Sequence, residues 1–168
     1  MAEVRRTHAI VPGTYDPVTL GHLDVIERAR KVFDHVTVGV AASRGKRGVG
    51  TAFTLEERVA MIEEVIEDKG LTRVDVHPFE GLLVDFCHEM GAGVVVKGLR
   101  ATSDFEFELH QADLNQQLSP DIESVFVMAS PSLGFVSSSV VRELAAFGVF
   151  QESLVPPSVM RHLKDHYQ

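Results

Sequence analysis

Short apolar runs of strand length alternate in this chain with longer stretches in which apolar residues recur at helical spacing. The clearest run is Val-Thr-Val-Gly-Val-Ala-Ala at 36–42, which is rich in β-branched residues. Such a run is expected when both faces of a parallel strand are covered. Strands that alternate with helices form βαβ units with right-handed crossovers, so the alternation predicts an α/β fold with a largely parallel sheet.

The expected elements fill the whole chain. We expect strands at 5–11, 36–42, 74–77, 94–96 and 122–128, and helices at 21–33, 54–70, 82–90 and 103–118, from 137 and from 156. Two helix starts carry a capping box, Thr54 with Glu57 and Ser103 with Glu106. A chain of 168 residues, 45% of them apolar, can bury a real core. We therefore predict one domain over 1–168, a Rossmann-like doubly wound domain with a five-stranded parallel sheet and C-terminal helices.

Composition argues against several classes of protein. The formal net charge of -8 and the isoelectric point near 5.4 argue against a nucleic-acid or membrane-surface partner, because either needs a broad basic face. Cys87 is the only cysteine, so no internal disulfide can form, and its neighbours Leu83 and Phe86 indicate a buried thiol. No long apolar segment follows the charged N-terminus, so we expect no signal peptide, no membrane span and a cytoplasmic protein.

The stretch Val-Pro-Gly-Thr-Tyr-Asp-Pro-Val-Thr-Leu-Gly-His at 11–22 joins the first expected strand to the first expected helix. At a helix start, unpaired N–H groups and aligned peptide dipoles attract anions. His22 lies in the first helical turn, and Thr14 and Thr19 add hydroxyl groups. We interpret the stretch as a phosphate site in which His22, neutral or charged, stabilises negative charge. The alternative is that His22 only bonds a neighbouring backbone carbonyl.

Basic clusters follow two other expected strands, at positions where parallel sheets bind ligands beyond their carboxyl ends. Arg44, Lys46 and Arg47 crowd a glycine-containing loop, which is either a solvated basic loop or, through a flexible lysine, a partner for phosphate. Lys97 and Arg100 leave the fourth strand together, either as ordinary strand-end polarity or as a clamp for a polyphosphate.

Hydroxyl and carboxylate groups follow later in the chain. One of the three serines at 137–139 is expected to cap the helix that starts there, and the others would offer hydroxyl and N–H groups to a second phosphate. Glu108 lies one helical turn beyond Asp104 and is either a surface carboxylate or an acceptor for a ribose hydroxyl.

Several common catalytic signals are absent from the sequence. It contains no Walker A motif, and Gly-Ala-Gly at 91–93 precedes a strand, so it is not a dinucleotide fingerprint. No cysteines and histidines have zinc-site spacing, and no Gly-x-Ser-x-Gly elbow occurs. Phosphate binders without a covalent nucleophile indicate a direct displacement at phosphorus, in which one bound substrate attacks the other.

Three motifs carry a resemblance to a known family. PGTYDPVTLGH, KGLRATSDFEFE and FVSSS are similar to the signatures of bacterial phosphopantetheine adenylyltransferases, within the nucleotidyltransferase superfamily. The resemblance implies transfer of the adenylyl group of ATP to 4'-phosphopantetheine, which gives dephospho-coenzyme A and pyrophosphate. It also implies magnesium as cofactor, a homohexamer, and dephospho-coenzyme A and coenzyme A as further ligands. The metal ligands stay unassigned.

The resemblance also assigns roles to single positions. His22 would stabilise the transition state, together with the charges of Lys46 and Arg100, and Thr14 and Tyr15 would lie in the loop that both substrates share. The positions that would hold phosphopantetheine are Lys46, Leu83 and Lys97. Those that would hold ATP include Gly98, Leu99, Arg100, Glu108, Leu133, Gly134, Phe135, Val136, Ser137, Ser138 and Ser139.

Two features depart from the family pattern. The family often has arginine where this chain has Lys97, which keeps the charge but loses the bidentate fork. The loop between Lys46 and Phe53 is longer than is usual in the family, so the places of Arg44 and Arg47 stay open.

Two other functions compete with this one. A nucleotidyltransferase that acts on nicotinate mononucleotide or a glycerol phosphate would explain the loop with His22 equally well, but would not need Lys46, Leu83 and Lys97 to hold a long pantetheine arm. A non-catalytic ATP-binding sensor would bind ATP and release no pyrophosphate with any acceptor.

Overall fold

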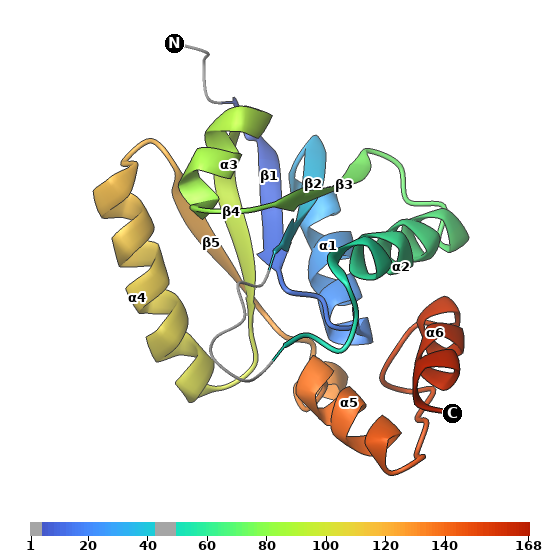
Figure 1. The fold of residues 1–168 in the computed structure, drawn as a ribbon. Coiled ribbons are helices and arrows are strands. Elements are labelled where there is room, and N and C mark those ends of the chain that lie inside the picture. Colours follow the sequence, from blue (N-terminus) through green and yellow to red (C-terminus); the bar gives the residue numbers. More distant parts are fainter. Residues whose placement is uncertain (1–4, 43–49) are drawn as a thin grey trace.

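The structure is a computed structural model that describes residues 5–42 and 50–168 (Figure 1). Its strands are β1 (Arg5–Gly13), β2 (His35–Ala41), β3 (Val74–Phe79), β4 (Ala92–Leu99) and β5 (Glu123–Met128). Its helices are α1 (Leu20–Val32), α2 (Leu55–Asp68), α3 (Leu83–Met90), α4 (Thr102–Leu118), the short 3-10 helix η1 (Pro131–Leu133), α5 (Ser138–Ala146) and α6 (Pro157–Tyr167).

The strands form one parallel sheet in the order β3-β2-β1-β4-β5, which confirms the predicted fold class. The chain builds outward from β1 to β3 and then returns to place β4 on the other side of β1. The strand order therefore reverses between β1 and β4, and sheets of this kind bind ligands beyond the carboxyl ends of such a pair.

Helices cover both faces of the sheet (Figure 1). On one face, Ala9 and Val11 of β1 pack in a core that also holds apolar residues of α1 and α2. On the other face, Ile10 packs with Val95 of β4 and with Phe86 of α3. Successive strand residues are therefore buried on opposite faces, which is why these strands read as continuous apolar runs in the sequence.

The helix starts only partly follow the predicted capping. Thr54 and Glu57 form the predicted capping box at α2. The predicted box of Ser103 with Glu106 is wrong, because α4 begins at Thr102, two residues earlier than that box requires, and its N-cap Ala101 has no side-chain cap. The first turn of α4 instead brings Asp104 to Arg100, whose backbone N–H donates to the carboxylate at 3.2 Å.

The helix α4 differs from the other long helices because none of its described residues is fully buried. Several large apolar side chains of this helix face solvent, as does Met128 at the end of β5. The exposed large apolar residues there are Phe105, Phe107, Leu109, Leu114, Leu118 and Met128. In the described ranges, no helix is long and apolar enough to cross a membrane.

Cys87 has no exposed surface, as predicted from its apolar neighbours. Burial raises the pKa of the Cys87 thiol to about 12, and the charge of Asp121 adds to the rise. A thiol of this kind stays protonated and takes no part in the chemistry described below.

Candidate active site

A cavity of about 340 Å³ opens beyond the carboxyl ends of β1 and β4, where the strand order reverses. It collects residues from the end of β1, the start of α1, the end of β4, one side of α4 and the start of α5. They are Val11, Pro12, Gly13, Tyr15, Thr19, Gly21, His22, Asp24, Val25, Val96, Lys97, Gly98, Arg100, Asp104, Glu108, Ala129, Leu133, Val136, Ser137, Ser138 and Ser139. Three of the predicted anion sites, at the starts of α1 and α5 and at the end of β4, therefore share one cavity, and the loop with Arg44, Lys46 and Arg47 lies outside the described residues.

The start of α1 is built by Thr19 and His22, which form a capping box. The hydroxyl oxygen of Thr19 accepts a hydrogen bond from the backbone N–H of His22 at 3.3 Å. In return, the backbone N–H of Thr19 donates to Nδ1 of His22 at 3.0 Å. Because Nδ1 is the acceptor, the neutral ring carries its proton on Nε2. Nε2 has no partner within the described residues, so it can donate to a ligand in the cavity.

His22 is held as a neutral imidazole. Burial, together with the nearby charges of Arg100 and Lys97, lowers its pKa to about 4. The ring also contacts Tyr15 edge-on, with the ring centroids 4.8 Å apart. At neutral pH the side chain is therefore a hydrogen-bond donor through Nε2 without a positive charge of its own.

The loop after β1 is shaped by Tyr15. Its backbone has a positive φ of 54°, which is uncommon for a residue other than glycine. Its buried hydroxyl donates to the carbonyl of Val11 at 2.8 Å, and this bond holds the ring beneath the loop. A Cβ at Gly13 would lie 3.0 Å from the ring, so any larger residue there would push the ring by a few tenths of an ångström. The ring contact with His22 extends this support to the start of α1.

The end of β4 supplies the two cations of the predicted clamp. Nζ of Lys97 lies 3.3 Å from a carboxylate oxygen of Glu108. The guanidinium of Arg100 pairs with Asp104 at 3.0 Å and donates to the carbonyl of Val136 at 3.1 Å. Both cations are thus aimed into the cavity by carboxylates of α4, and a bound phosphate would compete with these carboxylates for them.

The three serines at the start of α5 have different hydrogen bonds. Ser137 is the N-cap, and its hydroxyl oxygen accepts from the backbone N–H of Val140 at 3.2 Å. The hydroxyl of Ser138 donates to the carbonyl of Pro17 at 2.7 Å, which ties α5 to the loop after β1. The hydroxyl of Ser139 has no hydrogen bond within the described part of the chain and lines the cavity. Ser139 therefore keeps its whole hydroxyl group for a ligand, whereas Ser137 keeps only its O–H donor and Ser138 uses its donor on Pro17.

Comparison with known proteins agrees with this geometry. A family model described as cytidylyltransferase-like matches residues 10–144. The phosphopantetheine adenylyltransferase of Staphylococcus carnosus (strain TM300) is 43% identical over 159 residues, which cover 95% of this chain and 96% of that protein. That of Staphylococcus haemolyticus (strain JCSC1435) is 42% identical over 163 residues, which cover 97% and 98% of the two chains. The chain belongs to the phosphopantetheine adenylyltransferases.

Solved structures confirm the nucleotidyltransferase fold. A bifunctional NMN adenylyltransferase/ADP ribose pyrophosphatase from Francisella tularensis aligns with a TM-score of 0.73 at 16% identity, over 96% of this chain and 51% of that one. A putative nicotinate-nucleotide adenylyltransferase from Vibrio parahaemolyticus aligns with a TM-score of 0.66 at 16% identity, over 94% and 97% of the two chains. This chain spans about half of the Francisella protein, and at this identity the likeness shows the fold alone.

Most positions that the resemblance assigns to substrates line the cavity of this phosphopantetheine adenylyltransferase. The assigned residues found there are Tyr15, His22, Lys97, Gly98, Arg100, Glu108, Leu133, Val136, Ser137, Ser138 and Ser139. Gly98 has a packing reason as well, since a Cβ there would lie 2.8 Å from a methyl carbon of Val25 in α1.

Other assigned positions lie outside the cavity lining. Thr14 is exposed in the adjoining loop, and Leu83 packs at the start of α3 against the core on the opposite face of the sheet. Leu99, Gly134 and Phe135 adjoin lining residues without being lining residues themselves. Lys46, with Arg44 and Arg47, lies outside the described residues.

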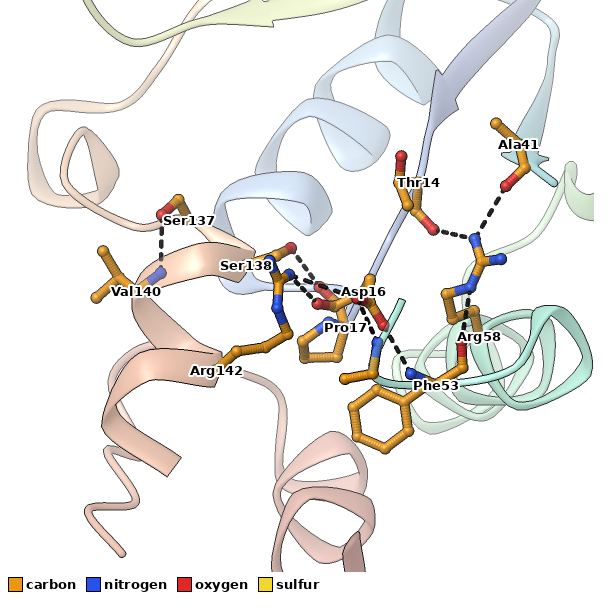
Figure 2. A network of polar contacts seen from close by, with 11 residues as sticks. Thr14, Asp16, Pro17, Ala41, Phe53, Arg58, Ser137, Ser138, Val140 and Arg142 are labelled. Atoms are coloured by element: carbon orange, nitrogen blue, oxygen red, sulfur yellow. Dashed lines mark hydrogen bonds and ion pairs between the residues drawn. The ribbon is translucent and has the colours of Figure 1, made fainter. Parts of the chain in front are cut away.

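Sequence reasoning missed three charged residues that hold the site together (Figure 2). Asp16 accepts hydrogen bonds from the backbone N–H groups of Ala52 and Phe53, both at 2.9 Å. Arg142 of α5 donates to the carbonyl of Asp16 at 2.6 Å, and Arg58 of α2 is 2% exposed. Arg58 carried a signal in the sequence, because helical spacing places it on the buried side of α2 with Met61, Ile62 and Val65.

Proposed function

We propose that the cavity carries out adenylyl transfer from ATP to 4'-phosphopantetheine by one direct displacement. The supporting observation is that the Nε2 donor of His22, the cations Lys97 and Arg100 and the starts of α1 and α5 all line this cavity. The groups are donors and cations suited to phosphate, and none of them is an activated covalent nucleophile.

In the proposed step, an oxygen of the phosphopantetheine phosphate attacks the α-phosphorus of ATP. The bond from that phosphorus to the oxygen that bridges to the β-phosphate breaks, and pyrophosphate leaves with the bonding electron pair. A phosphate monoester has its second pKa near 6, so the attacking group is already mostly ionised at neutral pH and needs no general base. The protein supplies position and charge.

His22 acts in this step as a neutral donor. With its Nδ1 occupied by the Thr19 N–H, the ring can direct only Nε2 to a phosphate oxygen at the reacting centre. A pKa of about 4 in the free protein keeps the ring uncharged before binding, and bound phosphate would raise it. A preorganised donor of this kind contributes roughly 3 kcal/mol to barrier lowering.

Lys46, Lys97 and Arg100 are the cations we propose for the substrates' phosphates. Lys97 and Arg100 line the cavity, each within reach of a carboxylate of α4 that a ligand phosphate could replace. Lys46 comes from the resemblance and lies outside the described residues. Lys97 binds as a point charge, without the fork of the arginine that is common in the family.

We propose magnesium as the cofactor on the basis of the resemblance. Within the described residues, no group of three His, Cys, Asp or Glu side chains could hold a metal ion. Magnesium usually needs no such cage, because substrate phosphates and water provide most of its ligands. No step above is routed through the ion.

We also propose a homohexamer in the cytoplasm, with dephospho-coenzyme A and coenzyme A as further ligands of the site. The support for self-association is the exposure of large apolar side chains on α4 and at the end of β5, where Phe107 is 62% exposed and Met128 is 64% exposed. Exposed large apolar side chains are a common feature of interaction surfaces. The number of subunits, the compartment and the coenzyme A ligands come from the resemblance.

The assay for this function is pyrophosphate release with magnesium, ATP and each acceptor in turn. We expect release with 4'-phosphopantetheine and none above background with nicotinate mononucleotide or glycerol phosphate. Release with a rival acceptor alone would overturn the acceptor assignment. If none of the acceptors leads to pyrophosphate release, and the protein still binds ATP in calorimetry, the result would favour an ATP sensor instead.

A further inference from the structure

Arg58 is a buried cation in α2 whose Nε and Nη1 donate to three backbone carbonyls (Figure 2). Its Nη1 donates to the carbonyl of Thr14 at 2.6 Å and to that of Ala41 at 3.0 Å. Its Nε contacts the carbonyl of Phe53 at 3.3 Å. Among the described residues it forms no ion pair with a carboxylate, so carbonyl dipoles are the partners of its Nε and Nη1.

These three carbonyls belong to separate parts of the site. Thr14 lies in the loop after β1, Ala41 is the last residue of β2, and Phe53 directly precedes the N-cap of α2. Ala41 and Phe53 therefore mark the two ends of the β2–α2 connection. That connection includes Lys46, which the resemblance assigns to phosphopantetheine. One side chain thus fixes both ends of the connection against the loop that both substrates share.

Asp16 reinforces the same junction from the loop side. Its carboxylate accepts hydrogen bonds from the backbone N–H groups of Ala52 and Phe53, and it is itself 4% exposed. Burial lowers the pKa of Arg58, and the charges of Asp16 and Glu56 oppose the change. A buried charge costs free energy unless it is well hydrogen-bonded, so an apolar side chain at position 58 would fill the core at lower cost. The presence of a charged arginine here therefore indicates that its hydrogen bonds are needed to position the backbone segments that it joins.

We propose that Arg58 is a positioning residue of the transfer reaction, which fixes the acceptor side of the site by holding Thr14, Ala41 and Phe53 together. This inference rests on the proposed function. The reaction depends on geometry, because a misplacement of about 1 Å at the reacting atoms can cost a hundredfold in rate.

The nucleotide side is held by other contacts. Arg142 donates to the carbonyl of Asp16, Ser138 donates to that of Pro17, and Arg100 donates to that of Val136. These bonds fix the start of α5 to the loop after β1 and to the end of β4, and none of them involves Arg58. A change at Arg58 should therefore affect the acceptor far more than ATP.

The experiment compares steady-state kinetics of the full chain, Arg58→Met and Arg58→Lys. Methionine is close to arginine in length and apolar, and it removes all three hydrogen bonds. We expect Arg58→Met to raise the KM for 4'-phosphopantetheine about tenfold or more, with the KM for ATP within about twofold of the original. Lysine keeps the charge but has a single nitrogen for three carbonyls, so Arg58→Lys should fall between the two.

The matched control is Arg73→Met. Arg73 also donates to a backbone carbonyl, that of Asp34 at 3.0 Å, but it is exposed and joins the α1–β2 loop to the start of β3, at the amino ends of the strands and away from the cavity. The Arg73→Met variant should leave both KM values unchanged. Thermal unfolding of each variant, read by circular dichroism, determines the folded fraction by which kcat is corrected.

The outcomes separate this inference from the function on which it rests. If the unaltered chain releases no pyrophosphate with 4'-phosphopantetheine, the proposed function fails. If the unaltered chain does release pyrophosphate, the two variants decide. An original KM for 4'-phosphopantetheine in both Arg58→Lys and folded Arg58→Met would show that Arg58 is only structural. Equal rises in both KM values would also overturn the positioning role. If Arg58→Met does not fold, Arg58→Lys decides, because it retains the buried charge and should still show the acceptor-specific rise.

Discussion

At the scale of single residues, the site depends on which polar atoms already have a hydrogen-bond partner within the protein. His22 uses Nδ1 to accept from the Thr19 backbone, and this leaves Nε2 as its donor. Ser138 donates its hydroxyl proton to Pro17 and Ser137 accepts from the N–H of Val140, so Ser139 is the serine with neither its donor nor its acceptor in use within the described residues. Neighbouring residues of the same type therefore have different tasks, which the sequence pattern cannot distinguish.

Replacing His22 tests its role as donor. We expect His22→Ala to lower kcat by about a hundredfold or more and to lower the free energy of unfolding by about 1 kcal/mol, because the capping box is lost. His22→Gln is the matched variant, since glutamine at this helix position can still accept from the Thr19 N–H. It should recover stability in urea unfolding without recovering kcat. Turnover near the original level in His22→Ala would remove this residue from the mechanism.

The lowered pKa of His22 predicts a pH dependence of stability. The pKa falls from 6.5 in the unfolded chain to about 4 in the folded one, so the unfolded chain binds more protons between these values. Stability from this group is therefore complete above pH 6.5 and is lost as the pH falls towards 4, by up to about 3 kcal/mol.

The measurement is urea unfolding of the original chain and His22→Gln at several pH values in this range. His8, whose pKa burial also lowers, contributes to both proteins, so the difference between them isolates His22. The original chain should lose more stability than the variant as the pH falls. Parallel curves would show that His22 titrates normally in the folded protein.

At the scale of elements, the starts of α1 and α5 meet beyond the ends of β1 and β4. Each start has a side-chain cap, Thr19 for α1 and Ser137 for α5. The remaining N–H groups of both first turns adjoin the same cavity, so the two helix dipoles favour negative charge in one place. The sheet makes this arrangement possible because it places β1 and β4 next to each other.

The serines at the start of α5 should separate stability from binding. We expect Ser137→Ala to lower the free energy of unfolding by about 1 kcal/mol, since it removes the cap. Ser139→Ala should change stability by less than about 0.5 kcal/mol and should raise the KM for ATP several-fold. Chemical unfolding and initial-rate kinetics on both variants give the answer. An unchanged KM for ATP in Ser139→Ala would show that its hydroxyl does not bind the nucleotide.

At the scale of the whole molecule, one edge of the fold remains open to a partner. The helix α4 carries Glu108 and Asp104 towards the cavity, while Phe105, Phe107 and Leu109 of the same helix are largely exposed. A partner on this face would therefore press on the helix whose carboxylates hold Lys97 and Arg100. In the proposed assembly, the interface and the active site would therefore both include α4.

A charge on this face should weaken assembly. We expect Phe107→Glu to lower the molecular mass measured by sedimentation at micromolar concentration, because a carboxylate placed in an apolar contact pays a desolvation cost. Val32→Glu is the matched control, since Val32 is 76% exposed at the end of α1. It should keep the original mass. A hexamer that withstands Phe107→Glu would place the interface elsewhere.

The sequence allowed prediction of the features that depend on local pattern. The alternation of apolar runs and helical periods predicted the parallel sheet, and the stretch at 11–22 predicted the start of α1 with His22 in its first turn. The capping box at Thr54 followed from the same kind of local rule. These features succeed because neighbouring residues determine them.

The features that failed or were missed depend on contacts between distant segments. The box at Ser103 was wrong because the earlier start of α4 brings Asp104 to Arg100. Arg58 and Asp16 were missed because their partners lie in segments joined only by folding, such as Thr14 with α2. Only the position of Arg58 on the buried side of its helix gave a hint in the sequence.

The central claim is that the cavity brings both substrates together for one displacement at the α-phosphorus of ATP. Its most direct test is the stereochemistry of transfer from ATP with a chiral phosphorothioate at that phosphorus to 4'-phosphopantetheine. A single in-line attack by the acceptor inverts the configuration at phosphorus, and inversion is the predicted result. Retention would mean two successive displacements through an adenylylated residue of the protein, and would contradict the claim.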